Sequence, residues 1–339
     1  MSVTVLTLIP GTPRSSFGHA VAGDELFIIG GHPGPFHQYD RSSFSSEVHA
    51  YDIKRNKWRQ CRSLPRPIQG LRAATYNKCV YTFGGFSYEP SLPADPWAAL
   101  SLDKVFRYSV DRDEWDYVAD MPHRRSSYIC EVLRGRVYLI GGWDGTPRSI
   151  GDKRGSFVSS IDVFDFATER FMPSTLSMAV PLRRAFSSTI YEGNIVMVGG
   201  LGADGYVNSH LFADALSASV HESNPTPLGS GTLKIEWSLL GQLPHAVFSP
   251  GAGVASAQLL VAGGLGPLLP PYGGASLSSI QSYDKNTRSW TTLPVAMSEA
   301  KSFVEIAPLP DGRAMLIGGH RGFEDDGMPT DRIEVFQLS

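Results

Sequence analysis

The stretch LFIIGG at residues 26–31 decides the fold, because five similar stretches follow it along the chain. Each is a short apolar run that ends in two glycines: VYTFGG at 80–85, VYLIGG at 137–142, IVMVGG at 195–200, LVAGG at 260–264 and MLIGG at 315–319. The first glycines of successive copies are 54, 57, 58, 64 and 55 residues apart. A recurring period of this length indicates a repeat architecture in which each repeat is one supersecondary unit.

Three further strands are predicted around each apolar run. A turn such as Gly23-Asp24 precedes the run and predicts a hairpin with an earlier strand. After the glycines come a loop and an alternating segment such as Glu47–Asp52, which is typical of a half-buried strand. A large aromatic residue follows about six residues later in four repeats, at Trp58, Trp115, Phe171 and Trp290. Four strands in each of six repeats predict an all-β fold, a six-bladed β-propeller with four antiparallel strands per blade.

The two ends of the sequence are predicted to meet in one blade. The segment Arg332–Ser339 reads as the third strand of the sixth repeat, with no fourth strand after it. The segment Val3–Leu8 reads as a fourth strand with no repeat before it. We therefore expect residues 1–339 to form a single propeller in which strand 3–8 completes the C-terminal blade. This closure removes the open edges of the ring.

The double-glycine ending, the Tyr-Asp or Phe-Asp strand and the tryptophan that follows resemble the Kelch repeat. The resemblance covers nearly the whole chain and implies a propeller that serves as an interaction domain. The fourth repeat departs from the pattern, because Trp237 follows its expected third strand, near Ser209–Asp214, by 23 residues. We expect residues 215–233 to be an insertion in blade four, on the face opposite the post-glycine loops.

Composition argues against nucleic acid and membranes as partners. The net charge is −3 and 19% of residues are charged, which predicts no basic surface for either. No apolar run reaches the roughly 20 residues of a membrane helix, and the N-terminus lacks the basic region of a signal peptide. Cysteines 61, 79 and 130 form neither a disulfide framework nor a zinc motif. With no phosphate-binding glycine motif either, we expect a cytoplasmic protein without a metal or a cofactor.

The post-glycine loops are the predicted location of the binding site. They are long, and in Kelch propellers such loops share one face around the axis. Long loops on a rigid scaffold usually carry function, and aromatic residues are enriched in recognition surfaces. The aromatic candidates for ligand contact are Tyr39, Trp97, Trp143, Tyr206 and Tyr272. The alternative is that these loops fold back and cap the blades.

A second group of candidates is basic. Arginine or lysine stands near the start of several first strands, about 16 residues before the double glycine: Arg14, Arg125, Arg183, Arg184 and Lys301. Because the first strands of a propeller crowd the axis, we expect these side chains at the channel mouth. Guanidinium groups there suit carboxylates, which predicts a pocket for an acidic peptide or an anionic small molecule. The alternative is that they support neighbouring loops through carbonyl or carboxylate contacts.

Two histidines and one aspartate complete the candidate ligand-binding residues. His32 and His320 directly follow their double glycines in blades that closure makes adjacent, and Asp144 follows the third double glycine. The leading interpretation is a Kelch-type binding module that recognises a protein or small-molecule partner at the long-loop face and central funnel. The alternative is a stand-alone Kelch enzyme, such as a sugar isomerase of the mutarotase type or a lyase. It would use arginine, histidine and carboxylate groups in the funnel, and the lack of an adaptor domain favours it.

Overall fold

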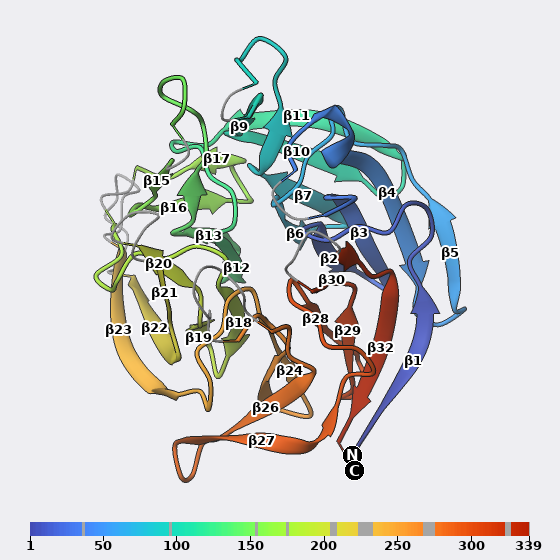
Figure 1. The fold of residues 1–339 in the computed structure, drawn as a ribbon, viewed down its shortest axis with the longest axis vertical. Coiled ribbons are helices and arrows are strands. Elements are labelled where there is room, and N and C mark those ends of the chain that lie inside the picture. Colours follow the sequence, from blue (N-terminus) through green and yellow to red (C-terminus); the bar gives the residue numbers. More distant parts are fainter. Residues whose placement is uncertain are drawn as a thin grey trace.

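The computed structural model describes residues 1–35, 38–94, 97–152, 155–173, 176–203, 209–222, 233–266, 275–322 and 327–338. Six four-stranded antiparallel sheets surround a central axis as blades (Figure 1). The predicted all-β, six-bladed fold is therefore confirmed. The described residues contain one short helical segment, the 3-10 helix η1 (Arg41–Ser43).

The strands of each blade follow one another from the axis outward. Blade one contains β2 (Gly18–Ala22), β3 (Glu25–Gly31), β4 (Ser45–Asp52) and β5 (Lys57–Gln60), and blade two contains β6 (Arg72–Tyr76), β7 (Cys79–Phe83), β10 (Lys104–Ser109) and β11 (Glu114–Asp120). Blade three contains β12 (Ile129–Leu133), β13 (Arg136–Ile140), β16 (Ile161–Asp165) and β17 (Arg170–Phe171), and blade four contains β18 (Ser187–Tyr191), β19 (Asn194–Val198), β22 (Asp214–Glu222) and β23 (Leu233–Gln242). Blade five contains β24 (Gly251–Ala255), β25 (Gln258–Ala262), β26 (Ser279–Asp284) and β27 (Ser289–Ala296), and blade six contains β28 (Glu305–Pro308), β29 (Ala314–Ile317), β32 (Arg332–Gln337) and β1 (Ser2–Leu8).

The N-terminal strand completes the last blade. β1 pairs antiparallel with β32, from Ser2 opposite Gln337 to Leu8 opposite Arg332. The two ends of the chain lie side by side as a result (Figure 1). The predicted closure is confirmed, and it gives blade six the same four strands as the other blades.

The double glycines are the joints between blades. Gly30 has φ +62°, and a Cβ there would lie 2.4 Å from the carbonyl oxygen of Ile68, so only glycine fits this close approach. The amide of Gly31 donates to the same carbonyl at 2.8 Å. Equivalent bonds join the next blades: Gly85 to Arg125, Gly142 to Arg183, Gly200 to Val247 and Gly264 to Lys301. The repeated glycine pair therefore makes the contact between successive blades from blade one to blade six.

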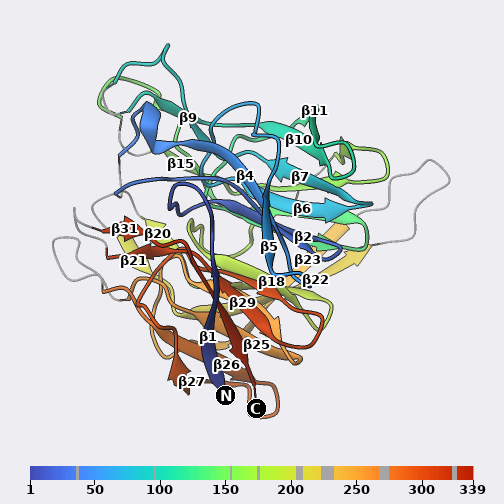
Figure 2. The same cartoon turned by 90° about the vertical axis from the view of Figure 1, so that its right-hand side faces the viewer.

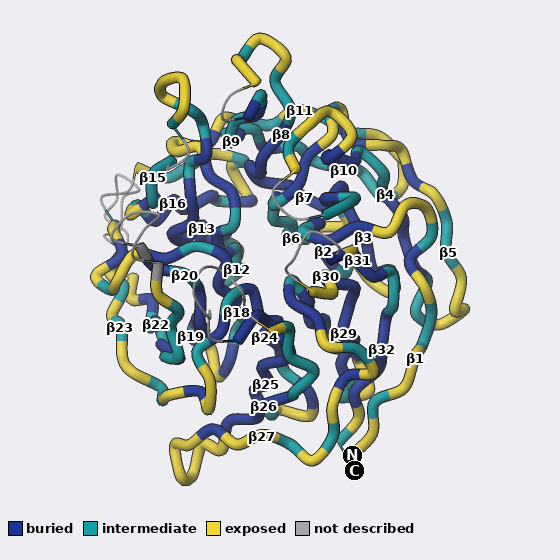
Figure 3. Tube along the Cα trace, viewed as in Figure 1, coloured by how far each residue is buried: buried dark blue, intermediate teal, exposed yellow. Residues whose placement is uncertain are grey.

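Apolar side chains fill the spaces between neighbouring blades. Phe27 and Val48 of blade one, for example, share a buried cluster with Val80 and Tyr108 of blade two. Buried residues follow the strands, and exposed residues lie mainly on loops and outer strands (Figure 3). The hydrophobic core is therefore a set of interblade layers around the axis, as expected for repeats that bury their faces on each other.

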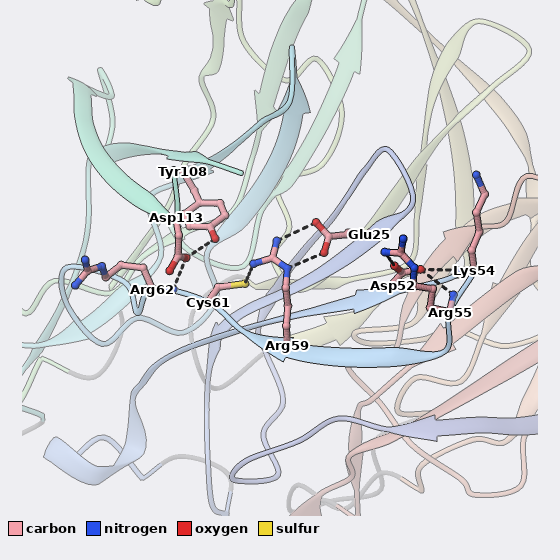
Figure 4. A network of polar contacts seen from close by, with 9 residues as sticks. All are labelled: Glu25, Asp52, Lys54, Arg55, Arg59, Cys61, Arg62, Tyr108 and Asp113. Atoms are coloured by element: carbon pink, nitrogen blue, oxygen red, sulfur yellow. Dashed lines mark hydrogen bonds and ion pairs between the residues drawn. The ribbon is translucent and has the colours of Figure 1, made fainter. Parts of the chain in front are cut away.

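Polar contacts reinforce the joint between blades one and two (Figure 4). Arg59 on β5 donates two hydrogen bonds to Glu25, at 2.7 and 2.9 Å, and one to the sulfur of Cys61 at 3.1 Å. Asp113 of blade two accepts hydrogen bonds from the Tyr108 hydroxyl and from the backbone amide at position 62. Blade one's outer strand is thereby fixed to the turn of blade two.

Blade four differs from its prediction. Ser209–Leu211 forms β21, which pairs with β20 (Leu201–Ala203) in a small separate sheet, and the third strand of the blade is β22. Ala215–Glu222 therefore belongs to a strand and not to an insertion, and Leu233 begins the next strand. Glu222 lies 2.7 Å from Arg136, beside the β12–β13 turn, which is on the face opposite the post-glycine loops. The prediction failed because both segments alternate in polarity, and only pairing distinguishes them.

Candidate functional site

The post-glycine loops lie on one face of the propeller, which we call the long-loop face (Figure 2). They form four small two-stranded sheets: β8 (Phe86–Tyr88) with β9 (Ala99–Ser101), β14 (Trp143–Asp144) with β15 (Ser156–Phe157), β20 with β21, and β30 (His320–Arg321) with β31 (Met328–Pro329). The residue after each glycine pair also bridges to a residue just before the first strand, as His32 does with Ser15 and Trp143 with Ser126. These bridges hold the first residue of each post-glycine loop beside the innermost strand of its blade.

Three of the predicted aromatic residues come together on this face. Ring centroids lie 5.6 Å apart for Tyr39 and Trp97, and 5.9 Å apart for Trp97 and Trp143. Phe44 and Phe86 pack against them, so that loops of blades one, two and three share one apolar cluster. We call these five residues the loop cluster.

The loop cluster is largely internal. Trp97 is 8% exposed and Trp143 is 5% exposed, and the Trp97 indole donates to the carbonyl of Gly145 at 3.0 Å. Tyr39 is half-buried. The cluster therefore stabilises the loops from within, as the alternative interpretation expects, and direct ligand contact by these residues stays a prediction.

Four of the predicted basic residues are fully buried and paired with carboxylates of their own blades. Arg14 lies 3.1 Å from Glu47, Arg125 2.6 Å from Asp162, Arg183 3.0 Å from Asp214, and Lys301 2.8 Å from Glu334. The three arginines also donate to the carbonyl of the first glycine of their blade: Gly30, Gly141 and Gly199. The expectation that they face the channel mouth was wrong, because a desolvated cation needs internal acceptors. Ligand binding by them stays a prediction.

The remaining candidates on this face have separate environments. The guanidinium carbon of Arg184 lies 4.7 Å from the Trp143 ring centroid, a cation–π contact between blades four and three. Asp144 accepts a hydrogen bond from the amide of Thr146 at 3.0 Å. Tyr206 and Tyr272 lie outside the described residues.

The two candidate histidines are buried at the seam between blades six and one. His32 has its ring nitrogens 2.8 Å from the carbonyl of Ser43 and 2.7 Å from that of Pro35. His320 lies 3.4 Å from the carbonyl of Gly34, and burial lowers the pKa of His320 to about 4. Within the described residues, no group of three or more histidine, cysteine or carboxylate side chains is arranged to hold a metal ion.

A ring of six backbone positions surrounds the axis just inside the long-loop face. All six have a left-handed φ between +47° and +60°: Ser16, Gly70, Ser127, Ala185, Ser249 and Phe303. Five hydrogen bonds run around the ring from one blade to the next, such as Gly70 to Ser16 at 2.6 Å and Ser249 to Ala185 at 2.7 Å. These residues line a cavity of about 30 Å³, which we call the mouth cavity.

A second cavity, of about 50 Å³, lies on the axis and gathers polar groups from different blades. Arg72 Nη1 donates to Glu305 Oε1 at 2.6 Å, and His19 Nδ1 lies 3.5 Å from Glu305 Oε2. Glu131 accepts a hydrogen bond from the Ser188 hydroxyl at 2.6 Å. We call this cavity the inner chamber. It brings together five ionisable side chains that the sequence patterns did not single out as ligand-binding candidates: His19, Arg72, Cys130, Glu131 and Glu305.

The signal for the inner chamber was present in the first strands. Small residues dominate these strands, so a charged residue there stands beside the axis and faces its counterparts. His19, Arg72, Glu131 and Glu305 are such residues, on β2, β6, β12 and β28. Burial lowers the pKa of His19, despite the nearby Glu305, and raises the pKa of Glu131 to about 7.

Comparisons with known proteins agree with this architecture. A family model of the Kelch motif matches residues 13–65, 69–122 and 124–174. A solved structure described as "Structure of YjhT" superposes with a TM-score of 0.76 at 14% identity, covering 98% of both chains, which shows a shared fold. The described residues contain no helix long and apolar enough to cross a membrane.

Curated relatives carry the same repeat over part of their length. Kelch repeat and BTB domain-containing protein 12 of Homo sapiens is 24% identical over 188 residues, 53% of this chain and 29% of that protein. Kelch-like protein 15 of Homo sapiens is 21% identical over 288 residues, 80% of this chain and 41% of that protein. The chain thus spans less than half the length of these relatives. With three matched Kelch motifs between residues 13 and 174, and the same glycine joints in blades four and five, the chain is a six-bladed β-propeller that carries Kelch motifs.

Proposed function

We propose that this propeller is a protein-binding module whose partner docks on the long-loop face. The observation that carries the proposal is the loop cluster, in which loops from three blades share one apolar core. Loops without such a core would have to be ordered by each partner, at a cost in conformational entropy. Packed loops present a preorganised surface, so loops that are ordered from within can recognise a partner with their exposed side chains.

Exposed apolar side chains support docking on this face. Ile150, in the loop between β14 and β15, is 77% exposed, and Leu182, just before blade four's first strand, is 38% exposed. Arg184 and Tyr39 add half-buried groups of the kinds enriched at protein interfaces. A protein is favoured over an anionic small molecule, because four of the five candidate cations already bind internal carboxylates.

The proposal includes a cytoplasmic location and excludes nucleic acid and membranes as partners. The three cysteines are free thiols, which agrees with a reducing cytoplasm. The net charge of −3 gives neither nucleic acid nor an anionic membrane an electrostatic attraction.

The test is partner capture with matched surface variants. Wild-type protein, Ile150→Asp and Leu239→Asp are immobilised, and the bound proteins are quantified by mass spectrometry. Leu239 is the control, because it is 53% exposed on the outer strand β23 of blade four and not on a post-glycine loop. We expect partners that bind the wild type and Leu239→Asp equally and are lost, by at least tenfold, on Ile150→Asp. Loss on Leu239→Asp alone, or no difference between variants, contradicts the proposed surface.

An enzyme is the second candidate, because the inner chamber brings His19, Arg72, Glu131 and Glu305 together. Converging titratable groups are the elements of acid–base chemistry, including sugar isomerisation. Exchange between the anomers of reducing sugars, followed by NMR, tests this candidate. Acceleration by the wild type that Glu131→Gln abolishes would support an enzyme, and rates equal to buffer would exclude this activity.

A further inference from the structure

The two axial cavities share one ion pair. Arg72 of blade two and Glu305 of blade six line both the mouth cavity and the inner chamber. Their side chains meet at 2.6 Å although 233 residues separate them in the sequence. The pair therefore lies between the mouth cavity and the inner chamber. We call this ion pair the bar.

A second carboxyl group lies beside the bar. Arg72 Nε donates to the carbonyl of Tyr128 at 2.7 Å, three residues before Glu131 in the same blade. Arg72 thus contacts blade three, which carries Glu131, as well as Glu305 of blade six. Within the described residues, Glu131 forms no ion pair with a lysine or an arginine, and its hydrogen bond comes from Ser188.

The charge of the inner chamber depends on Glu131. Arg72 and Glu305 cancel, and the first strand of blade five, Gly251–Ala255, carries no ionisable residue. Burial lowers the pKa of His19 and raises the pKa of Cys130, so both are neutral near pH 7. The remaining group is Glu131, and burial raises the pKa of its carboxyl to about 7 although Ser188 and Arg72 oppose this shift. The chamber is neutral with Glu131 protonated and carries one negative charge without that proton.

We propose that the protonation of Glu131 decides the partner of Arg72 and thereby gates the axial channel. With Glu131 protonated, Arg72 stays on Glu305 and the bar is closed. When Glu131 loses its proton, its carboxylate competes with that of Glu305 for Arg72, whose charge acts on both, while Glu305 keeps His19 at 3.5 Å. The guanidinium then moves toward blade three, and the inner chamber opens to the mouth cavity.

Cys130 lines the inner chamber and reports on this opening. The labelling rate of its thiol by a small alkylating reagent is measured between pH 5.5 and 8.5 by peptide mapping, for the wild type and Glu131→Gln. Ionised Glu131 by itself raises the pKa of Cys130, which would lower the wild-type rate relative to the variant. Opening of the inner chamber would instead raise the wild-type labelling rate of Cys130 relative to the variant. We expect the ratio of wild-type to variant rates to rise at least fivefold through pH 7, and a flat or falling ratio overturns the proposal.

Two controls keep the test decisive. Cys79, half-buried on β7 and outside the chamber, is labelled in the same sample. The rate ratio of Cys130 to Cys79 in the wild type should therefore rise through pH 7 even if the Glu131→Gln variant does not fold. Glu305→Gln removes the fixed partner of the bar and should label Cys130 rapidly already at pH 6. Slow labelling of Glu305→Gln at every pH would show that the ion pair does not control access.

Discussion

The ammonium of Lys301 lies 2.8 Å from the carboxylate of Glu334, and both side chains are fully buried. The pair joins the segment before β28 to the third strand of blade six, β32. Buried arginines make the corresponding contact in three other blades, at Arg14, Arg125 and Arg183. In these four blades, an ion pair links the segment before the first strand to the third strand. The pair is a structural feature of the repeat.

Breaking this pair from one side should destabilise the protein strongly. Lys301→Met leaves Glu334 charged, buried and unpaired, which costs about 3–5 kcal/mol. The double variant Lys301→Met/Glu334→Leu removes both charges and should recover most of that loss. Chemical denaturation of the three proteins measures the free energies of unfolding. A single variant as stable as the wild type would contradict the structural role of the pair.

The same pair should weaken in acid. Burial acts to raise the pKa of Glu334, but the Lys301 ammonium and hydrogen bonds from Ser298 outweigh it and leave this pKa below its ordinary value. The contribution of the pair is therefore present above the unfolded pKa of about 4.3 and is lost as the pH falls through the lower folded pKa. Denaturation at pH 6 and pH 3 measures the free energies of unfolding of the wild type and the double variant. From pH 6 to pH 3 the wild type should lose more of this free energy than the double variant. A difference independent of pH would refute this linkage.

Two adjacent arginines should respond differently to alanine substitution. Arg125 is fully buried against Asp162, whereas Arg124 is 46% exposed and lies 3.3 Å from Asp103. Arg125→Ala leaves the Asp162 carboxylate without its buried cation and should cost about 3 kcal/mol or more. Arg124→Ala should change stability by less than about 1 kcal/mol. Equal effects in thermal denaturation would argue against the assigned difference in burial.

Removal of residues 2–8 should open the ring. β1 supplies the outer strand of blade six, and the partly buried Val3 packs against the buried cluster between blades five and six. We expect a measurable fall in the melting temperature, since a loss of 1 kcal/mol lowers it by about 2–4 °C in a domain of 150–250 residues. Val5→Thr is the control, because Val5 is 51% exposed and the substitution leaves the strand in place. An unchanged melting temperature of the deletion would contradict the closure.

Trp97→Ala should loosen the long-loop face without unfolding the propeller. The indole packs on Tyr39, Phe86 and Trp143 and bonds to the carbonyl of Gly145. Hydrogen exchange should therefore accelerate in residues 86–101 and 143–157, and it should stay slow in β3 and β13. Faster exchange in the blades as well would mean that the loop cluster is part of the global core.

The repeat could be predicted from sequence because its determinants are local. Each glycine pair stands at a joint that only glycine can make, and the runs before it form the buried second strands. Blade four was mistaken because the alternation at 209–214 resembles that of a blade strand, whereas β22 and its partner β23 continue for 9 and 10 residues. Strand pairing, and not the pattern of either segment, decides which one joins the sheet.

The candidate site was predictable only in part. The sequence identified the basic residues before the first strands, but the carboxylates that pair with them, such as Asp162 and Glu334, stand on third strands 31–37 residues away. The inner chamber could not be assembled from spacing, because Arg72 and Glu305 meet only when the ring closes. Tyr39, Trp97 and Trp143 pack together, but their packing depends on loop conformations that no periodic pattern encodes.

Hydrogen exchange of the free protein and of its complex with a captured partner tests the central claim most directly. Binding at the long-loop face should slow exchange in residues 86–101, 143–157 and 181–186. The hairpin turns at 23–24 and 134–135, on the other face, should exchange at the same rate in both states. Protection of those turns, with unchanged exchange in the long loops, would contradict the account.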